Sequence, residues 1–277
     1  MTRFSLIVPT LHRTAELDRL FASLQAQDAT FQVIVIDQNA DDRIGPIVSR
    51  FKSKFELIHI SSAQRGAARA RNTGLEIATG DIVAFPDDDA WYPPNLLKQI
   101  DERFRNEHAL AGICVRGTDE HGLDAGIRWR KRPAQINRLN VWRTGIEWSM
   151  FVRRDAVTDI RFNEDLGPGA NTPWGAGEGA DFLLHVLRKG RGRYDPSLVV
   201  HHPAQTDDPL TKEKALGYAR GLGRVLKLNR YPLPIAALLC FGPSVRAVAR
   251  VARFDFEGGI YAQRVALQRW AGYRAEP

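Results

Sequence analysis

Three consecutive aspartates, Asp87–Asp89 (the acidic triplet), are the side chains of this sequence most able to do chemistry. They follow an apolar run, Ile82–Phe85, which is typical of a buried strand, and they precede Trp91–Pro94, which indicates the start of a helix. Adjacent carboxylates at a strand exit repel one another unless a cation offsets their charge. Mg²⁺ and Mn²⁺ prefer oxygen ligands, and Mg²⁺ commonly shares one or two carboxylates with substrate phosphates. The triplet therefore predicts a site for a divalent metal and a diphosphate, the alternative being an acidic turn that caps the next helix.

The composition is that of an ordinary globular protein. The 277 residues are 44% hydrophobic and 26% charged, enough for one large domain or one domain with an appendage. The net charge of +7 indicates an anionic partner, such as a phosphorylated substrate, an acidic lipid or nucleic acid, or else a basic solvated surface. Cys114 and Cys240 lie in apolar runs and are expected to be buried thiols in a reducing compartment. We expect no signal peptide and no apolar run of the roughly 20 residues that span a bilayer.

The first part of the chain alternates apolar runs with amphipathic segments. This pattern predicts an α/β fold with a mostly parallel, doubly wound sheet and helices on both faces. Strands are expected at residues 4–8, 33–36, 57–60, 82–85 and 111–115, and helices at 17–24, 44–51, 67–78 and 96–104. Beyond these, loops and short antiparallel strands are expected over 116–141, a strand over 147–152, a helix over 180–189 and a strand over 198–200.

The end of the chain has a different character. We expect a main domain at 1–206 and a helical, basic, amphipathic C-terminal extension at 207–277. After Gly242-Pro243, one helical face carries Val245, Val248, Ala249 and Ala252, and another carries Arg246, Arg250 and Arg253. A helix of this kind can lie on an anionic membrane surface, or its apolar face can pack on the main domain. Both interpretations remain open at this point.

Polar side chains follow several of the expected strands. Thr10 and Arg13 come after the first strand, Asp37 after the second, and Arg65-Gly66 after the third. Because ligands of open α/β sheets bind beyond the carboxyl ends of the strands, these side chains are expected to share one site with the triplet. Carboxylates beside guanidinium groups are typical of a nucleotide site with a metal. The glycine fingerprints of Rossmann and Walker sites are absent from the sequence.

Taken in order, these segments resemble glycosyltransferase family 2. The similar segments are Val8-Pro-Thr with Arg13, Val35-Ile-Asp37, Arg65–Gly74, Thr79-Gly-Asp81 and Phe85–Trp91. Each is weak alone, whereas the ordered set is specific, and the similarity covers about residues 3–203. The resemblance implies the GT-A fold, with a nucleotide-binding part at about 1–115 and an acceptor and catalytic part at about 116–206.

The resemblance also implies roles for single residues. Thr10, Arg13 and Asp37 would line the nucleobase and ribose pocket, together with Pro9. Gly66 would let the backbone approach the nucleotide, and Arg71 would support this region. Asp87 and Asp88 would face the ribose and the donor sugar. Asp89 would bind the divalent metal, Mg²⁺ or Mn²⁺, that bridges the diphosphate. His202 would complete the metal or diphosphate site, with His201 as the alternative.

Members of the family carry a Glu-Asp pair at the start of a late helix, and one of the two acids is the catalytic base. The matching segment here is Trp174–Phe182, in which glycine stands where the second acid is usual. Glu178 is expected to be the base, because it ends a flexible loop and can reach an acceptor hydroxyl. Asp181, a first-turn helix acid, is the alternative. Trp174 would either stack on a sugar face or pack in the fold.

These implications predict an inverting, metal-dependent transferase that moves a sugar from a nucleoside-diphosphate sugar, by default a UDP-sugar, to an acceptor hydroxyl. The acceptor would be a glycan or a lipid-linked sugar. The setting would be bacterial cell-surface polysaccharide or glycolipid synthesis in the cytoplasm or at the cytosolic membrane face, with no nucleic-acid partner.

Two alternatives stay open. A sugar-phosphate nucleotidyltransferase would need a glycine-rich loop after the first strand, which Pro9–Arg13 lacks. A non-enzymatic basic protein that binds membrane or nucleic acid gives no reason for three adjacent acids at a strand exit.

Overall fold

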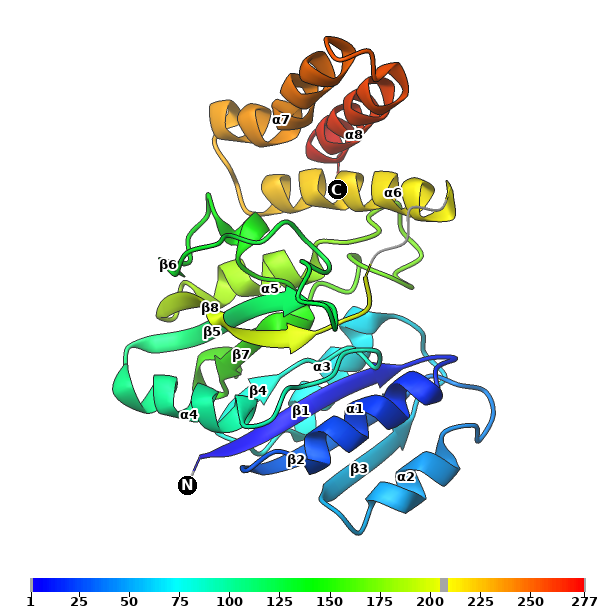
Figure 1. Ribbon diagram of the computed structural model, residues 1–277, viewed down its shortest axis with the longest axis vertical. Helices are drawn as coiled ribbons and strands as arrows, with labels where there is room; N and C mark the ends of the chain where they lie inside the picture. The colour runs from blue at the N-terminus through cyan, green and yellow to red at the C-terminus, as the bar shows by residue number, and fades with distance from the viewer. Residues whose placement is uncertain (1, 205–208, 277) are drawn as a thin grey trace. The chain divides into compact units, whose positions relative to one another are not determined.

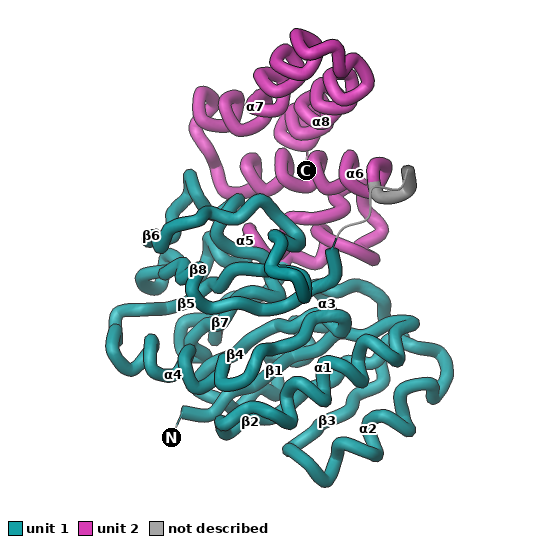
Figure 2. The backbone as a smooth tube through the Cα atoms, in the orientation of Figure 1, with its two compact units in different colours: residues 1–162, 182–205 teal, residues 163–181, 206–277 magenta. Residues whose placement is uncertain are grey.

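The computed structural model describes residues 2–204 and 209–276, which form two compact units. Unit 1 comprises Met1–Phe162 and Phe182–Gln205, and unit 2 comprises Asn163–Asp181 and Thr206–Pro277 (Figure 2). The placement of the two units relative to one another is not defined, and each is described by itself.

An eight-stranded sheet forms the centre of unit 1, in the order β3-β2-β1-β4-β7-β5-β8-β6 (Figure 1). Its strands are β1 (Arg3–Thr10), β2 (Thr30–Asp37), β3 (Glu56–Ser61), β4 (Ile82–Ala84), β5 (Leu110–Thr118), β6 (Ala134–Gln135), β7 (Met150–Arg153) and β8 (Arg191–His201). Only β6 and β7 run against the others among the described strands. Residues 33–36 of β2 are fully buried, as expected of a strand covered on both faces. The predicted mostly parallel α/β sheet is therefore confirmed.

Helices cover both faces of this sheet (Figure 1). They are α1 (Ala15–Gln25), α2 (Gly45–Phe51), α3 (Ala67–Ile77), α4 (Leu96–Asn106) and α5 (Glu178–Val186). Right-handed crossovers place α1 and α2 on one face, and α3, which returns the chain from β3 to β4, on the other. The apolar side chains predicted to face the sheet from α1 are all buried: Leu17, Leu20, Phe21 and Leu24.

The segment between β5 and β8 departs from the sequence prediction. Glu147–Ser149 form a 3₁₀ turn, and β7 begins only at Met150 and runs antiparallel between β4 and β5. The turn is closed by Ser149, whose Oγ donates to Ile146 O at 2.8 Å and accepts from Ile146 N at 3.2 Å. The strand predicted over 147–152 is thus wrong in its first half, because a local side-chain bond competes with the sheet there.

Unit 2 contains three long helices, α6 (Pro209–Leu228), α7 (Leu233–Val251) and α8 (Phe256–Arg274). The helix expected after Gly242-Pro243 in fact begins at Leu233 and runs through both residues. Pro243 has no N–H with which to bond the carbonyl of Leu239, and such a gap normally breaks a helix. Arg269 of α8 donates Nη1 to that carbonyl at 2.9 Å, so a neighbouring helix supplies the missing donor.

The length of α7 also corrects an expectation about membranes. By length and composition alone, its 19 residues, with a mean hydropathy of 1.3, are enough to cross a bilayer. The prediction that no segment approaches that length is therefore wrong, since Gly242-Pro243 does not interrupt the helix. A single helix of this kind is weak evidence for a membrane span.

The bond between Arg269 and Leu239 gives a stability prediction. We expect Arg269→Met to lower the free energy of unfolding by about 1–3 kcal/mol, because the Leu239 carbonyl then has no donor. Arg264→Met, an exposed position on the same helix, is the matched control and should change little. Urea unfolding followed by circular dichroism measures both variants. Equal stability of the two variants would contradict the role given to Arg269.

Candidate active site

Aromatic packing fixes the backbone at the end of β4, where the acidic triplet begins. The ring of Phe85 packs edge-on against Phe162 and Phe182, whose own rings stack with centroids 4.1 Å apart. Asn72 of α3 holds the backbone of Phe162 through two hydrogen bonds, of 2.8 and 3.0 Å. The exit of β4 is therefore fixed by aromatic packing before any charged group is considered.

Asp88 is buried and is bound by two residues that follow β1. The hydroxyl of Thr10 donates to Oδ2 at 2.8 Å, and Nη1 of Arg13 donates to Oδ1 at 2.7 Å. Burial raises the pKa of Asp88 to about 6, more than Arg13 and Thr10 lower it. Arg13 also lies 2.5 Å from Oδ2 of Asp89 and so joins two members of the triplet. Thr10 and Arg13, expected beside the nucleotide, thus lie against the triplet.

Asp87 is paired with Arg71 of α3. Nη2 of Arg71 donates to Oδ1 of Asp87 at 2.7 Å and lies 3.9 Å from Oε1 of Glu147. The Arg71 side chain is almost fully buried, and a buried guanidinium needs carboxylate partners. Arg71 therefore supports the triplet directly.

A short backbone bridge brings β8 to the triplet. Trp91 N donates to His201 O at 3.0 Å, and His201 N donates to Trp91 O at 2.9 Å. The next residue, His202, then has Nε2 3.1 Å from Oδ1 of Asp89. His201, the alternative ligand, instead places Nδ1 3.1 Å from the hydroxyl of Thr118. The structure therefore brings His202, rather than His201, to Asp89.

The imidazole of His202 has a fixed orientation. The ring of Trp148 stacks on it with centroids 4.7 Å apart, and Nδ1 lies 3.0 Å from Pro203 O. Because a carbonyl only accepts, Nδ1 carries a proton and donates it there. Burial lowers the pKa of His202, but the hydrogen bond and charge of Asp89 raise it more, so the net shift is upward. Nε2 is thus the nitrogen that gains or loses the proton, facing Asp89.

These side chains fit a divalent metal. Asp87, Asp89 and His202 each offer one ligand atom, and the three atoms lie within 4.8 Å of one another. Oδ1 of Asp89 is buried and lies 3.1 Å from Nε2 of His202. Carboxylate oxygens gathered beside an imidazole nitrogen are a ligand set suited to Mn²⁺ or Mg²⁺. The acidic helix cap, the alternative interpretation of the triplet, does not account for this cluster.

The other strand ends lie along the same edge of the sheet. Thr10 and Asp37 are register partners in the β1–β2 pair, as are Pro9 and Ile36. The buried carboxylate of Asp37 accepts from Asn39 N and Nδ2, at 2.9 and 2.7 Å, and lies 2.9 Å from His59 Nε2. These bonds hold Asp37 apart from the triplet's own network.

Gly66 caps α3 at this edge with φ of 128°, a conformation that favours glycine. Its carbonyl accepts from Nε2 of Gln38, the residue that follows β2, at 3.1 Å. The loop before α3 is thereby tied to the end of β2.

The residues proposed for catalysis belong to unit 2. Glu178 and Asp181 lie in the first turn of α5, and both are buried. Oδ1 of Asp181 accepts from Asn229 Nδ2 at 2.5 Å. The Gly167 backbone, with φ of 92°, approaches so closely that a Cβ there would lie 2.5 Å from the carboxylate carbon of Glu178. Trp174 lies under the guanidinium of Arg224, 5.4 Å from the ring centroid.

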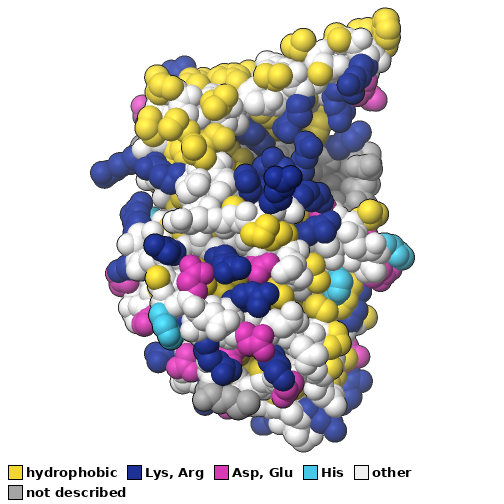
Figure 3. Space-filling view, turned by 60° about the vertical axis from the view of Figure 1, so that its left-hand side comes forward, with side chains coloured by type: hydrophobic (Ala, Val, Ile, Leu, Met, Phe, Trp, Pro, Cys, Tyr) yellow, Lys and Arg dark blue, Asp and Glu magenta, His cyan; other side chains and the backbone are white. Residues whose placement is uncertain are grey.

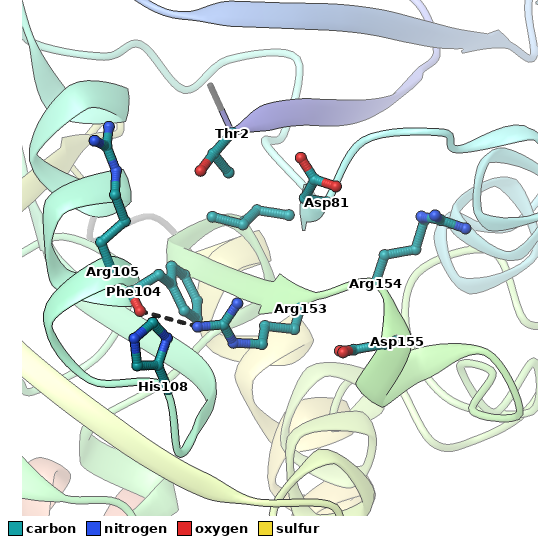
Figure 4. Close-up of a pocket in the computed structure, with 9 residues that line it drawn as sticks. Thr2, Asp81, Phe104, Arg105, His108, Arg153, Arg154 and Asp155 are labelled. Carbon is teal, nitrogen blue, oxygen red and sulfur yellow. Dashed lines mark hydrogen bonds between the residues drawn. The ribbon is translucent and has the colours of Figure 1, made fainter.

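A cavity of about 430 Å³ lies at the opposite edge of the sheet (Figure 4). It is lined by residues at the starts of β1 and β4 and at the end of the antiparallel β7, among them Asp81, Arg153 and Arg154. Arg153 points across it and donates to Phe104 O at 2.9 Å, and Arg154 donates to Gly80 O at 2.9 Å. Because the cavity is at the amino ends of the parallel strands, it is separate from the triplet.

Sequence reasoning missed several residues that hold the site together. Trp148, which stacks on His202, and His59, which contacts Asp37, are far from their partners in the chain. Trp91 was part of the family motif, but its bridge to His201 could not be foreseen. Of these residues, only His59 gave a signal in the sequence, because it interrupts the apolar run of β3.

The comparison with protein families identifies the class. The model of glycosyl transferase family 2 matches residues 5–161, more than half of the chain. The chain therefore belongs to glycosyl transferase family 2, and it is a glycosyltransferase. The match covers the triplet and the residues that follow β1, β2 and β3, and it does not favour either alternative function.

Two curated relatives illustrate the breadth of the family. The chain is 26% identical over 298 residues to the succinoglycan biosynthesis protein ExoM of Rhizobium meliloti, covering 95% of this chain and 94% of that protein. It is 32% identical over 184 residues to the GalNAc(5)-diNAcBac-PP-undecaprenol beta-1,3-glucosyltransferase of Campylobacter jejuni, covering 63% of this chain and 59% of that protein.

Solved structures show the fold. The mannosyltransferase PcManGT of Pyrobaculum calidifontis, in complex with GDP-Man and Mn²⁺, superposes with a TM-score of 0.64 at 17% identity, over 97% of this chain and 87% of that chain. Staphylococcus aureus TarS 1–349, in complex with UDP-GlcNAc, gives 0.59 at 16% identity, over 96% and 91%. The predicted GT-A type of fold with C-terminal helices is confirmed.

The contact between His202 and Asp89 predicts a pH dependence of metal binding. We expect Mn²⁺ affinity to fall as the pH is lowered through about 6. Asp88 takes up a proton there, and Nε2 of His202 becomes protonated as the pH falls. Titration followed by the electron paramagnetic resonance signal of free Mn²⁺, from pH 5.5 to 8.5, measures this. In His202→Gln the dependence should be shallower. If the Mn²⁺ affinity of the unmodified protein does not change between pH 5.5 and 8.5, the assignment is contradicted.

Proposed function

We propose that this glycosyltransferase transfers a sugar, with inversion, from a nucleoside-diphosphate sugar to an acceptor hydroxyl, and that it depends on a divalent metal. The observation that carries the proposal is the cluster of Asp87, Asp89 and His202 at the carboxyl edge of the sheet. Carboxylates and an imidazole gathered within 4.8 Å of one another, in a family 2 chain, support a metal-diphosphate site there.

The donor would lie along the carboxyl ends of β1, β2 and β4. Thr10, Asp37 and the Gly66 backbone would contact the nucleobase and ribose, with Pro9 shaping the pocket wall. Arg13 and Arg71 would keep the triplet in place and add positive charge near the diphosphate. A UDP-sugar is the default donor. TarS binds UDP-GlcNAc and PcManGT binds GDP-Man, so a nucleotide sugar is supported more firmly than any one base.

Asp89 and His202 would hold the metal, Mg²⁺ or Mn²⁺, while Asp87 and Asp88 would face the ribose and the donor sugar. When bound, the metal would neutralise the charge that develops on the leaving diphosphate. Arg13 and Thr10 keep Asp88 in position throughout, and Trp148 keeps the His202 ring from turning. Where Nε2 of His202 carries a proton, that proton must leave before the site can take a cation.

The acceptor would be deprotonated by Glu178, with Asp181 as the alternative. In a single displacement the hydroxyl proton passes to the carboxylate while the acceptor oxygen bonds the anomeric carbon. The bond from that carbon to the diphosphate oxygen breaks at the same time, and its electron pair leaves on the nucleoside diphosphate. The hydrogen bond from Asn229 to Asp181 supports a structural role for Asp181. Trp174 would stack on a sugar face.

The setting we propose is bacterial cell-surface polysaccharide or glycolipid synthesis, with a glycan or lipid-linked sugar as the acceptor. The names of ExoM and of the Campylobacter jejuni glucosyltransferase support this setting. We also propose that residues 1–206 form the transferase domain, that 207–277 form an appended extension, and that the enzyme works in the cytoplasm at the cytosolic membrane face. Nucleic acid is not a proposed partner.

The metal role is tested by Asp89→Ala. We expect the rate of nucleoside-diphosphate release to fall by about 10²-fold or more, because charge on the leaving group is then poorly offset. Asp41→Ala removes an exposed surface carboxylate and is the control, with activity close to that of the parent. The assay measures diphosphate release from a panel of nucleotide sugars with Mg²⁺ or Mn²⁺. Full activity of Asp89→Ala would reject the metal site.

The base assignment is tested by comparing Glu178→Gln with Asp181→Asn. We expect Glu178→Gln to lower kcat by about 10²–10⁴-fold with donor affinity largely retained, since the amide cannot take the acceptor proton. Asp181→Asn should instead lower the melting temperature and affect kcat less. If Asp181→Asn alone suppresses kcat without loss of stability, Asp181 is the base.

A further inference from the structure

The helices α7 and α8 expose large apolar side chains that nothing in unit 2 covers. On α7, Leu238, Val245 and Val248 lie on one face, spaced seven and three residues apart, and each is more than 70% exposed. The opposite face of α7 is buried and carries Ala236, Cys240, Pro243 and Ala247. Figure 3 shows hydrophobic side chains gathered over the helices that Figure 1 labels α7 and α8. The rest of unit 2 therefore leaves the apolar face of α7 uncovered.

The connection between α7 and α8 extends this surface. Phe254 is 84% exposed and Phe256 is 58% exposed, and their rings lie 6.4 Å apart. Phe254 has φ of 63°, a backbone conformation that is unusual for an aromatic residue. Asp255 fixes the turn, since Oδ1 accepts from Gly258 N at 2.9 Å and Oδ2 lies 3.1 Å from Arg250. We call residues 251–256 the tip, an ordered turn that presents two phenylalanines outward.

The charge of the C-terminal segment matches an anionic surface. Residues 209–277 contain twelve lysine or arginine and four aspartate or glutamate side chains, a net charge of +8, against +7 for the whole chain. The positive excess of the protein therefore resides entirely in this segment. Arg246 and Arg253 are exposed beside the apolar face of α7. Exposed apolar side chains flanked by arginines are the combination that binds the interface of a bilayer with acidic lipids.

Two other occupants fit this surface less well. A second copy of the chain, related by two-fold symmetry, would bring the arginines of both copies together with few acids to offset them. A transmembrane α7 would carry Arg246 and Arg250 into the hydrocarbon. It would also draw in α8, which packs along it and carries Glu257 and Arg264. If α7 and α8 lie in the plane of the membrane interface, the arginines of two copies do not meet and no charged side chain enters the hydrocarbon.

We propose that α7 and α8 form a membrane-docking surface that lies in the interface of an anionic bilayer, with Phe254 and Phe256 inserted among the acyl chains. The docking is monotopic, and the arginines beside α7 contact the lipid phosphates. This inference deepens the membrane location of the proposed function, but it requires neither donor nor acceptor.

Co-sedimentation of the full chain with vesicles tests the proposal. We expect binding to vesicles of phosphatidylcholine and phosphatidylglycerol and little binding to phosphatidylcholine alone. The double variant Phe254→Ser/Phe256→Ser should weaken binding about tenfold or more, because two aromatic side chains no longer leave water. The matched control is Leu139→Ser, a 62% exposed leucine in unit 1, which should bind as the parent does.

The charge contribution has its own pair of variants. Arg246→Gln/Arg253→Gln should weaken binding to the acidic vesicles about tenfold or more, whereas Lys52→Gln/Lys54→Gln, at exposed positions in unit 1, should not. Melting temperatures identify any variant that fails to fold.

Three results would overturn the proposal: equal vesicle binding by the parent and the phenylalanine variant, retention in the bilayer after alkaline carbonate extraction, or a soluble dimer that Val245→Ser/Val248→Ser dissociates. Because vesicle binding is measured without substrate, its failure is distinct from loss of transferase activity.

Discussion

Three carboxylates crowded at the buried exit of β4 must each be offset by positive charge, and the edge of the sheet is organised around that requirement. Arg13 comes from the end of β1, Arg71 from α3 and His202 from the end of β8. Each cation therefore draws a different element toward the triplet. The carboxyl ends of several strands meet at one point because their side chains carry complementary charges there, upon a foundation of packed phenylalanines.

This pairing of carboxylates with positive charges also explains how the site would respond to a divalent metal. Two guanidinium groups are permanent cations, whereas His202 is positively charged only when Nε2 carries a proton, a form that Asp89 favours. A divalent metal and that proton would compete for the space between Nε2 and Oδ1 of Asp89. Metal binding is thus coupled to proton release, and burial of Asp88, which raises its pKa to about 6, adds a second titrating group.

The sequence predicted the parts of this arrangement that local patterns encode. Uninterrupted apolar runs identified β1 to β5. Thr10 and Arg13, which follow β1, contact the triplet after β4, as parallel strands that end at one edge allow, whereas Asp37 after β2 keeps separate hydrogen bonds. Contacts between distant segments could not be predicted: Trp148 on His202, Asn72 on Phe162, and Arg269 on Leu239. The hydrogen bond from Arg269 to Leu239 lets α7 continue through Pro243. It therefore corrects both the expected start of the helix after Pro243 and the expectation that no segment is long enough to span a bilayer.

The central claim, that Asp89 and His202 hold a metal beside the donor diphosphate, is tested most directly by crystals grown with UDP and Mn²⁺. Anomalous scattering at the manganese edge locates the ion without reference to activity. The account predicts one strong peak within about 2.0–2.3 Å of a carboxylate oxygen of Asp89 and of Nε2 of His202. A nucleotide bound with its manganese away from both residues, or with none, would contradict it.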